Sequence, residues 1–205
     1  MDAQRRENRL MGVAGVAILA FLVIALVVEV RGDFPGDRRI LIELNETFGT
    51  DLDDVMVAVG AATDTLPLIG VWVVGAGVLW QLGRRRDAGL FVVTVLVAMA
   101  GNRLLKEVFA RPRPDIRVSP ESVSTFSFPS GHAANTLALV GAIWLVSPSG
   151  RRRWVAVVGS LLVALVGFSR VSISVHFLSD ILASWLWVGA WLVVVWRWRL
   201  RATAP

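Results

Sequence analysis

The chain of 205 residues contains two histidines, and both stand in short polar strings that separate long apolar stretches. His132 ends the string Phe-Pro-Ser-Gly-His at 128–132, and His176 lies four residues before Asp180. Residues four apart share one face of a helix. A carboxylate at that place can accept a hydrogen bond from one imidazole nitrogen and leave the other free to attack. The pattern predicts nucleophilic and acid–base chemistry.

Cations lie in the same strings. The one lysine among 21 basic residues is Lys106, seven positions before Arg113. Arg170 follows Ser169 at the start of the string that contains the second histidine. Arginine offers phosphate a planar fork, and lysine offers a point charge. Ser130 stands where a helix N-cap belongs, and Gly131 after it lets the backbone approach a ligand closely. Free amides at such a helix start bind anions, so these residues predict phosphoryl transfer.

Each of these residues also has a structural interpretation. A lone histidine is often a satisfied residue at a helix end, and arginines at span ends often snorkel toward water. Snorkelling accounts for Arg103 and Arg117, but it does not explain why the single lysine precedes an Arg-Pro pair. Glu29, Asn102 and Glu107 lie near the ends of apolar runs. The sequence does not decide whether these three support the site or only the fold.

Long apolar runs must position the polar strings. Hydrophobic residues make up 55% of the chain and charged residues 18%, a balance shifted toward lipid, and the mean hydropathy is +0.64. This composition excludes a disordered chain and argues against an ordinary soluble enzyme. The absence of cysteine removes disulfides and thiolate metal sites.

Six runs are uncharged and close to the roughly 20 residues that a membrane span needs: 10–28, 65–83, 88–102, 133–150, 154–169 and 181–196. The first run is longer than a signal-peptide core and lacks a small-residue cleavage site, so we expect an uncleaved helix. We therefore predict an all-α membrane protein. A single domain over 1–205 would form a bundle of six transmembrane helices.

Clustered arginines indicate the orientation of this bundle. Twelve of them lie in four groups, 5/6/9, 84–86, 151–153 and 197/199/201, which fall at alternate ends of the six runs. The positive-inside rule places all four groups, and both termini, in the cytoplasm. The net charge of +5 could otherwise suggest nucleic acid, but alternation with the spans argues against that partner. The polar strings would then face the extracytoplasmic side.

Two longer segments lie on that opposite side. Segment 32–64 is acidic, and its apolar residues recur at helical spacing. It predicts either amphipathic helices lying on the membrane or a packed cap over the bundle, with equal weight. The acidic positions within 33–54 lack EF-hand spacing, so we interpret them as a solvated face. Segment 106–129, rich in Pro, Arg and Ser, cannot span a membrane. Nine tryptophans fit membrane-interface belts rather than a substrate site.

The three strings have the patterns K-x6-R-P, P-S-G-H and S-R-x5-H-x3-D. They resemble the signature motifs of the type 2 phosphatidic acid phosphatase superfamily, which also contains bacterial non-specific acid phosphatases, glucose-6-phosphatase and vanadium haloperoxidases. The motifs run from 106 to 180, and the chain most resembles the small integral-membrane lipid phosphatases. Leu178 and Ser184 stand where Pro and Gly are common. These two departures concern local packing only.

The resemblance implies a mechanism for the predicted site. His176 would be the nucleophile and form a phosphohistidine, Asp180 would orient it, and His132 would act as general acid and then as base. The phosphate-binding residues that it implies are Lys106, Arg113, Ser130, Gly131 and Arg170. We expect neither metal nor cofactor, because the motif segments bring cations where a divalent ion would need several carboxylates.

The expected activity is hydrolysis of a lipid phosphate or diphosphate at the outer membrane surface. By resemblance the substrates are undecaprenyl pyrophosphate, phosphatidylglycerol phosphate or phosphatidic acid. The first is favoured, because the site faces the side where that diphosphate is released. An inactive lipid-binding or transport protein of the same fold is an alternative, against which the intact His132, His176 and Asp180 argue. A vanadium haloperoxidase-like enzyme is another, against which the lack of a large soluble body argues. The sequence leaves the oligomeric state open.

Overall fold

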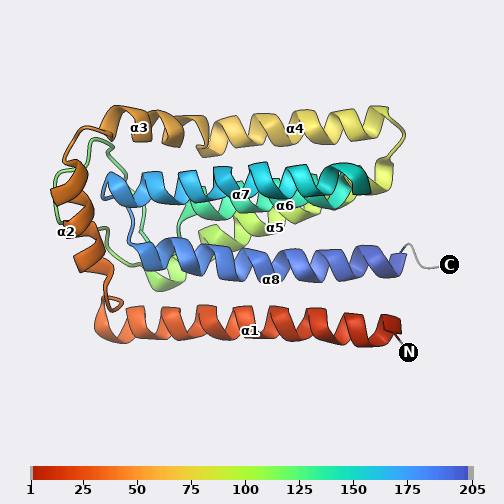
Figure 1. Ribbon diagram of the computed structural model, residues 1–205, viewed down its shortest axis with the longest axis horizontal. Coiled ribbons are helices and arrows are strands. Elements are labelled where there is room, and N and C mark those ends of the chain that lie inside the picture. The colour runs from red at the N-terminus through yellow and green to blue at the C-terminus, as the bar shows by residue number, and fades with distance from the viewer. Residues whose placement is uncertain (1, 203–205) are drawn as a thin grey trace.

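The computed structural model describes residues 2–202, and these fold entirely into helices and connecting loops (Figure 1). The eight helices are α1 (Asp2–Arg31), α2 (Asp37–Phe48), α3 (Asp53–Ala62), α4 (Thr65–Gln81), α5 (Arg85–Phe109), α6 (Gly131–Val146), α7 (Ser149–Ser172) and α8 (Leu178–Ala202). The all-α prediction is therefore confirmed for this part of the chain. Residues 1 and 203–205 of the predicted domain lie outside the described residues.

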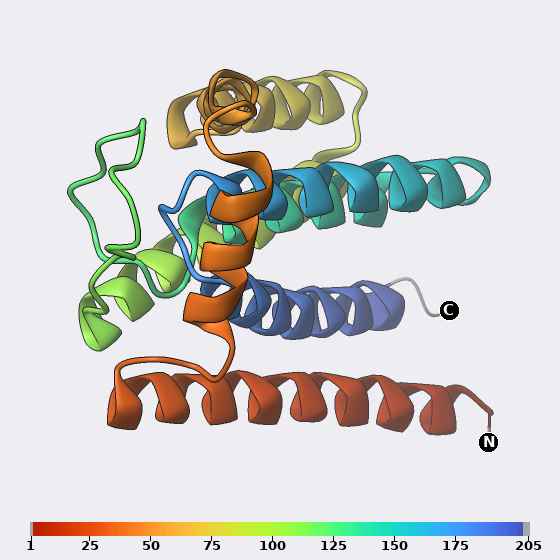
Figure 2. The same cartoon turned by 60° about the vertical axis from the view of Figure 1, so that its left-hand side comes forward.

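Six of the helices, α1 and α4 to α8, run along the long axis of the molecule, and α2 crosses one end of it (Figures 1 and 2). Each predicted apolar run lies mainly in one of these six. The run 133–150 differs from the other five, because it is divided between two helices. Helix α6 ends at Val146 and α7 begins at Ser149. Pro148 between them cannot continue a helix, because it has no N–H to donate.

Four helices are long and apolar enough to cross a membrane: α1, α5, α7 and α8. A fifth candidate is the pair α3 and α4, which passes the same test together but bends by 40°. Helix α6 has 16 residues, so at about 1.5 Å per residue it covers only about 24 Å. The finding supports a multi-pass membrane protein, whereas the count of six spans stays a prediction.

Helix α6 lies inside the bundle, and its apolar sequence fits that position. It packs against α4, α5, α7 and α8, and Ala133, Ala134, Ala138 and Ala142 on it are fully buried. Small side chains at these positions let the neighbouring helices approach closely, as in other membrane bundles. The outer surface of the bundle carries larger apolar side chains, such as Val16, which is 69% exposed. In a protein surrounded by lipid, such a surface faces hydrocarbon.

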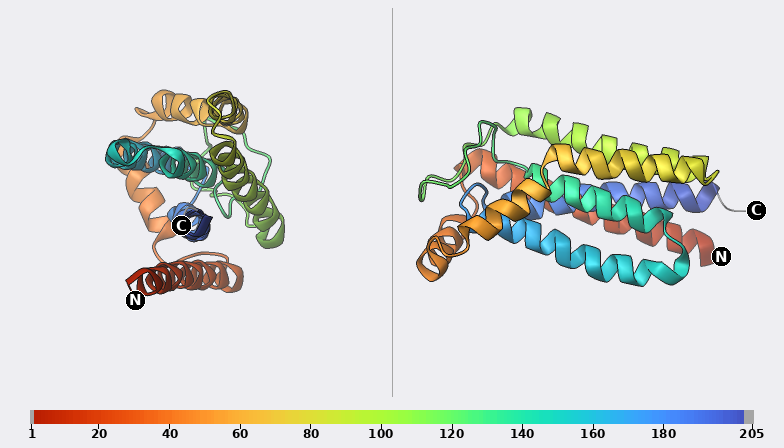
Figure 3. Two further views of the ribbon diagram at one scale, coloured as in Figure 1. Left: turned by 90° about the vertical axis from the view of Figure 1, so that its right-hand side faces the viewer. Right: turned by 90° about the horizontal axis from the view of Figure 1, so that it is seen from above.

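The two ends of the bundle differ in chemistry. Both ends of the described chain, the α4–α5 turn and the α6–α7 turn lie at one end (Figure 1, right; Figure 3). All four predicted arginine groups belong to this end. Helix α2, the loop 110–130 and the α7–α8 loop lie at the other end. The three polar strings are therefore brought together, as their places at alternate helix ends predicted.

Helix α2 packs across the bundle as a cap. Its Leu41 is fully buried in a cluster with Ala133, Phe177 and Ile181, so the packed-cap interpretation describes it well. The interpretation of positions 33–54 as a solvated face is wrong in part. Asp37 at the start of α2 is only 2% exposed. Ion pairs, described below, hold this carboxylate and that of Asp53 against the rest of the fold.

Candidate active site

The first polar string begins where α5 ends. Ala110 adopts a left-handed conformation with φ of 43°, and its N–H closes the helix on the carbonyl of Lys106. Prolines 112 and 114 then prevent any further helix. The chain leaves the bundle as an extended Arg-Pro-Arg-Pro segment, and the side chains of Arg111 and Arg113 reach back toward the start of α8.

A cavity of about 390 Å³ lies at this end of the bundle. Five of the eight predicted site residues line it: Lys106, Arg113, Gly131, His132 and His176. These residues come from α5, the loop after it, α6 and the α7–α8 loop. Asp180 lies directly behind His176, fully buried. The structure therefore places cations, a helix N-terminus and both imidazoles around one space.

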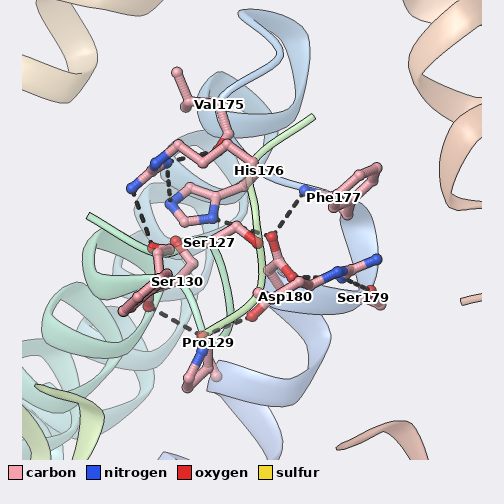
Figure 4. Close-up of polar contacts among 12 residues, drawn as sticks. Ser127, Pro129, Ser130, Val175, His176, Phe177, Ser179 and Asp180 are labelled. Atoms are coloured by element: carbon pink, nitrogen blue, oxygen red, sulfur yellow. Dashed lines mark hydrogen bonds and ion pairs between the residues drawn. The ribbon is translucent and has the colours of Figure 1, made fainter. Parts of the chain in front are cut away.

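His176 is held between Asp180 and Arg113. Figure 4 shows its ring beside the carboxylate of Asp180. Its Nδ1 is 3.2 Å from Oδ2 of Asp180, and its Nε2 is 3.3 Å from Nη1 of Arg113. A guanidinium can only donate, so Nε2 accepts from it and the ring proton resides on Nδ1. The same Oδ2 accepts from the backbone N–H of Phe177 at 2.9 Å. Asp180 thus fixes the tautomer that leaves a lone pair on the nitrogen near the cavity.

The surroundings of His176 keep its ring neutral. Only 2% of the residue is exposed. Burial lowers the pKa of the His176 imidazole well below its ordinary value, and the positive charge of Arg113 lowers it further. A neutral imidazole is the form that can act as a nucleophile.

Lys106 and Arg113, two cations on the cavity wall, both donate hydrogen bonds to backbone carbonyl groups. Arg113 donates to the backbone carbonyls of Thr125 and Val175 at 2.8 and 2.6 Å. Lys106 donates through Nζ to the carbonyls of Phe126 and Ser127. Neutral partners leave both formal charges uncompensated at these contacts. The cavity is lined by three cations, Lys106, Arg113 and Arg103, and by two carboxylates, Asp64 and Glu121, so positive charge is in excess.

Arg111, which sequence reasoning missed, forms a buried chain of contacts behind the histidine. Its Nη1 donates to Oδ1 of Asp180 at 2.6 Å and its Nη2 donates to Oδ2 of Asp37 at 2.9 Å. Asp37 also accepts from the N–H of Ser179 at 3.0 Å. The guanidinium lies 4.0 Å from the centre of the Phe177 ring. One arginine thereby joins the cap helix α2 to the carboxylate that orients the histidine.

Ser130 is the N-cap residue of α6, as predicted, but its side chain does not cap the helix. Its Oγ is buried and has no hydrogen-bond partner among the described residues. Its carbonyl accepts from the hydroxyl of Ser184 at 3.0 Å, which also donates to the carbonyl of Asp180 at 2.7 Å. Ser184, one of the two departures from the family pattern, thus ties α8 to the start of α6. The first amides of α6 remain without a side-chain cap.

Gly131 is not required by the packing of the protein itself. A Cβ placed there would lie 3.8 Å from Nδ2 of Asn102 and 3.8 Å from Cε of Lys106, which are ordinary contacts. The fold would accept a small side chain at this position. A requirement for glycine at position 131 would then come from a group bound in the cavity.

Arg170 differs from the other two predicted cations, because it does not line the cavity. It is fully buried, and its Nη1 donates to Glu121 of the loop 110–130 at 2.8 Å. Its Nη2 donates to the carbonyl of Met56 at 2.8 Å. A Cβ on Gly60 of α3 would collide with the guanidinium, so the glycine makes room for it. The role of Arg170 in binding phosphate stays a prediction. In this structure the carboxylate of Glu121 neutralises its charge.

His132 lies in the first turn of α6 with its side chain 19% exposed. Its Nε2 is 3.9 Å from Oδ1 of Asp64, at the junction of α3 and α4. Of the two imidazoles on the cavity wall, His132 is the one with an acidic neighbour other than Asp180, and its role as proton donor stays a prediction.

The structure distinguishes the three residues whose role the sequence did not decide. Asn102 is buried, lines the cavity and donates to the carbonyl of Pro129 at 3.4 Å, whereas Glu29 and Glu107 are exposed. Asn135, which the sequence analysis did not identify, also lines the cavity. Its Oδ1 is buried and has no hydrogen-bond partner within the described residues.

Snorkelling is the wrong interpretation of Arg117. The residue lies in the loop, where a double ion pair to Asp53, at 2.8 and 2.6 Å, fastens the loop to α3. Arg103 is exposed and contributes to the rim of the cavity.

Residues 2–202 bring no three His, Asp or Glu side chains together in a way that could hold a metal ion. The cations around the cavity would instead neutralise a bound anion. The fold and the site together define a helical membrane protein with a histidine–carboxylate pair beside a cationic anion cradle.

The family model of the PAP2 superfamily matches residues 87–204, more than half of the chain. The chain therefore belongs to the PAP2 superfamily, and the resemblance seen in its three motifs is confirmed. Among curated proteins it is 36% identical over 141 residues to phosphatidylglycerophosphatase B of Bacillus subtilis, covering 64% of this chain and 67% of that protein. It is 31% identical over 128 residues to undecaprenyl-diphosphatase of Sulfolobus acidocaldarius, covering 60% of each.

A solved structure shares the fold over nearly the whole chain. It is the crystal structure of a transmembrane PAP2-type phosphatidylglycerolphosphate phosphatase from Bacillus subtilis. The TM-score is 0.79 at 25% identity, and the match covers 94% of this chain and 97% of that one. The likeness therefore extends beyond the motif region to the helices that precede it.

Proposed function

We propose that this protein removes a phosphate from a membrane lipid by way of a phosphohistidine on His176. The general class, a hydrolase that acts on lipid phosphates, follows from membership of the PAP2 superfamily and from relatives named for such activities. The observation that carries the mechanism is the placement of His176. Asp180 holds its Nδ1 at 3.2 Å, and its Nε2 lies beside a cavity with a cationic wall.

In the first step the lone pair of His176 Nε2 attacks the phosphorus atom, and the bond from phosphorus to the lipid oxygen breaks. Lys106 and Arg113 neutralise the charge on the phosphoryl oxygens as it spreads over them. The backbone amides of Gly131 and His132, which line the cavity, supply further donors. Ser130 does not line the cavity, so its unpartnered hydroxyl stays a predicted donor. Asp180 stabilises the positive charge that the attacking imidazole acquires.

His132 completes the cycle. Acting as the general acid, it gives a proton to the departing lipid oxygen. In the second step it takes a proton from a water molecule that attacks the phosphorus. The phosphorus–nitrogen bond then breaks, which releases phosphate and restores both histidines. No metal ion takes part in this scheme, because the cations of the cavity perform the neutralisation.

The substrate class is a lipid phosphomonoester or diphosphate. A diphosphate carrier lipid or a phosphatidylglycerol phosphate agrees with the names of the two relatives. The cavity of about 390 Å³ opens at the end of the bundle and is lined by polar side chains. A head group fits this space while its tails stay in the bilayer beside the helices.

The proposed topology has six spans, with both termini in the cytoplasm and the site outside. The gathering of all arginine groups at the end opposite the cavity supports it (Figure 1). The native chain has no cysteine, so single cysteines report accessibility cleanly. Cysteine at Ser119 or Ser122 should react with an impermeant reagent in intact cells, and cysteine at Ser149 should not. The reverse labelling pattern would refute the orientation.

Trapping of the intermediate tests the mechanism. With a labelled lipid phosphate, acid-sensitive phosphoprotein should form in the wild type and be absent in His176→Ala. His132→Ala should turn over very slowly but still accept phosphate from a substrate with a very good leaving group, because such a group needs little acid assistance. Full activity in His176→Ala would refute the covalent route. Activity on no lipid phosphate in a well-folded wild type would refute the function itself.

A further inference from the structure

A second cavity lies at the arginine-rich end of the bundle, between α5 and α8. Its volume is about 1370 Å³, larger than the roughly 300–1,000 Å³ of ordinary small-molecule sites. Residues between 83 and 93 form one wall and residues between 191 and 199 form the other. Its lining residues belong to the α4–α5 turn, the start of α5 and the end of α8, which lie at the end of the bundle opposite α2 and the α7–α8 loop (Figure 1), and the proposed reaction makes no use of it. We refer to it as the α5–α8 cleft.

The mouth of the α5–α8 cleft carries an excess of positive charge. Arg84, Arg85, Arg86 and Arg199 line it together with one carboxylate, that of Asp87. That carboxylate accepts from Arg84 at 2.9 Å and is 3.2 Å from the guanidinium of Arg199. Arg85 and Arg86 are exposed, and neither forms an ion pair with a described residue. Four cations against one anion favour a negatively charged ligand.

The inner part of the α5–α8 cleft is apolar. Val93, Val194 and Trp198 on its walls are all exposed. At the inner limit the indole N–H of Trp191 donates to the carbonyl of Thr94 at 3.0 Å and joins the two helices. Thr94 lies eight to ten positions after the three arginines at 84–86, a depth of about 12–15 Å at 1.5 Å per residue. This approaches half of the roughly 30 Å hydrocarbon core, which is the thickness of one leaflet.

We propose that the α5–α8 cleft binds one anionic phospholipid of the leaflet at the arginine-rich end. Its phosphodiester lies among the arginines, and an acyl chain follows the apolar wall toward Trp191. Basic pockets between transmembrane helices bind anionic head groups in this way. A neutral lipid would fill the wall but leave Arg85 and Arg86 without an ion-pair partner. A second copy of the chain would oppose arginine to arginine across a two-fold interface, which repulsion disfavours.

Lipid binding to purified protein tests the proposal. The probe is phosphatidylglycerol, whose phosphodiester lacks the terminal phosphate that the proposed reaction removes, and phosphatidylcholine is the neutral comparison. Phosphatidylglycerol at about 100 times its Kd should raise the Tm by roughly 5 °C or more. The double variant Arg85→Gln, Arg86→Gln should weaken its binding about 30-fold, since each arginine near a membrane surface contributes about one kcal/mol.

The matched control is Arg151→Gln, Arg153→Gln, which removes two exposed arginines at the same end of the bundle that do not line the cleft. This pair should bind phosphatidylglycerol as the wild type does. Phosphatidylglycerol with brominated chains should quench tryptophan emission, and Trp198→Phe should lose part of that quenching. Arg113→Gln, at the catalytic cavity, should bind the probe normally.

Three results would overturn the proposal. Equal losses in the two arginine pairs would mean diffuse attraction without a site. Equal stabilisation by phosphatidylcholine would mean that the cations make no contribution. Loss of binding in Arg113→Gln alone would place the lipid in the catalytic cavity. Each result is read without hydrolysis, so it is independent of the proposed phosphatase mechanism.

Discussion

Replacing Arg111 with methionine should leave two buried carboxylates without a countercharge. Arg111 is 3% exposed and contacts Asp180 at 2.6 Å, Asp37 at 2.9 Å and the hydroxyl of Ser179 at 2.9 Å. Removing one partner of a buried ion pair costs about 3–5 kcal/mol. A typical domain has only about 5–15 kcal/mol of stability in total. We expect a large drop in the Tm, measured in one detergent for all variants.

The effect on catalysis should be separable from the effect on stability. Arg111 does not line the cavity, so it acts on the reaction only through Asp180 and His176. Loss of a residue that orients a metal ligand typically costs about 10–100-fold, and we expect a similar factor for a residue that orients the histidine. We expect kcat to fall by that factor in the folded fraction and KM to stay nearly constant. The loss should be smaller than that in Asp180→Asn, which removes the orienting charge itself.

Two variants keep this test decisive. Arg111→Lys keeps the charge but cannot reach both carboxylates with one planar fork, so it should fold and show an intermediate kcat. Arg117→Met breaks another loop ion pair, with Asp53 at 2.6 Å, that makes no contact with the histidines. It should lower the Tm and leave kcat unchanged. Wild-type kcat in a folded Arg111→Met or Arg111→Lys protein would refute the positioning role.

Three further predictions follow from the cavity. Glu121→Gln removes the carboxylate that pairs with Arg170 at 2.8 Å. KM should fall, by about tenfold at most, and kcat should stay nearly unchanged. A higher KM would show that Glu121 helps to bind substrate. Gly131→Ala should keep the wild-type Tm, because its Cβ makes only ordinary contacts, but lose activity where the methyl group meets phosphate; a stable and fully active variant would contradict the anion cradle. Turnover should survive EDTA and be inhibited by orthovanadate, and restoration of a chelated sample by Mg²⁺ would exclude the cationic mechanism.

The helices and the place of the site were predictable because membrane spans are long and uniform in sequence. Charge-free runs located α1, α4, α5, α7 and α8, and polar strings at alternate helix ends had to meet at one end of the bundle. The end of α6 was also visible in the sequence as Pro148, although charge alone extended the run beyond it. Local signals of this kind report where a helix begins and ends.

The contacts behind the histidine were not predictable. Asp37 and Arg111 lie 74 positions apart, and nothing in an acidic run distinguishes the one carboxylate that becomes buried. The pairing of Arg170 with Glu121, 49 positions away, is hidden for the same reason. Spacing reports neighbours along a helix, whereas ion pairs across the fold depend on how the loop 110–130 closes over the bundle. Such pairs require the three-dimensional arrangement.

The contact between Asp37 and Arg111 has a consequence for what counts as the minimal enzyme. The family model begins at residue 87, and the three motifs all lie beyond that point. Yet a carboxylate that anchors the catalytic arrangement comes from residue 37, on a helix that also buries Leu41 against the start of α8. A fragment that begins at residue 87 would carry every signature residue and still lack the partner of Arg111. The working unit of the proposed enzyme is therefore larger than the segment by which the family is recognised, because helix α2 supplies a buried carboxylate to the candidate site.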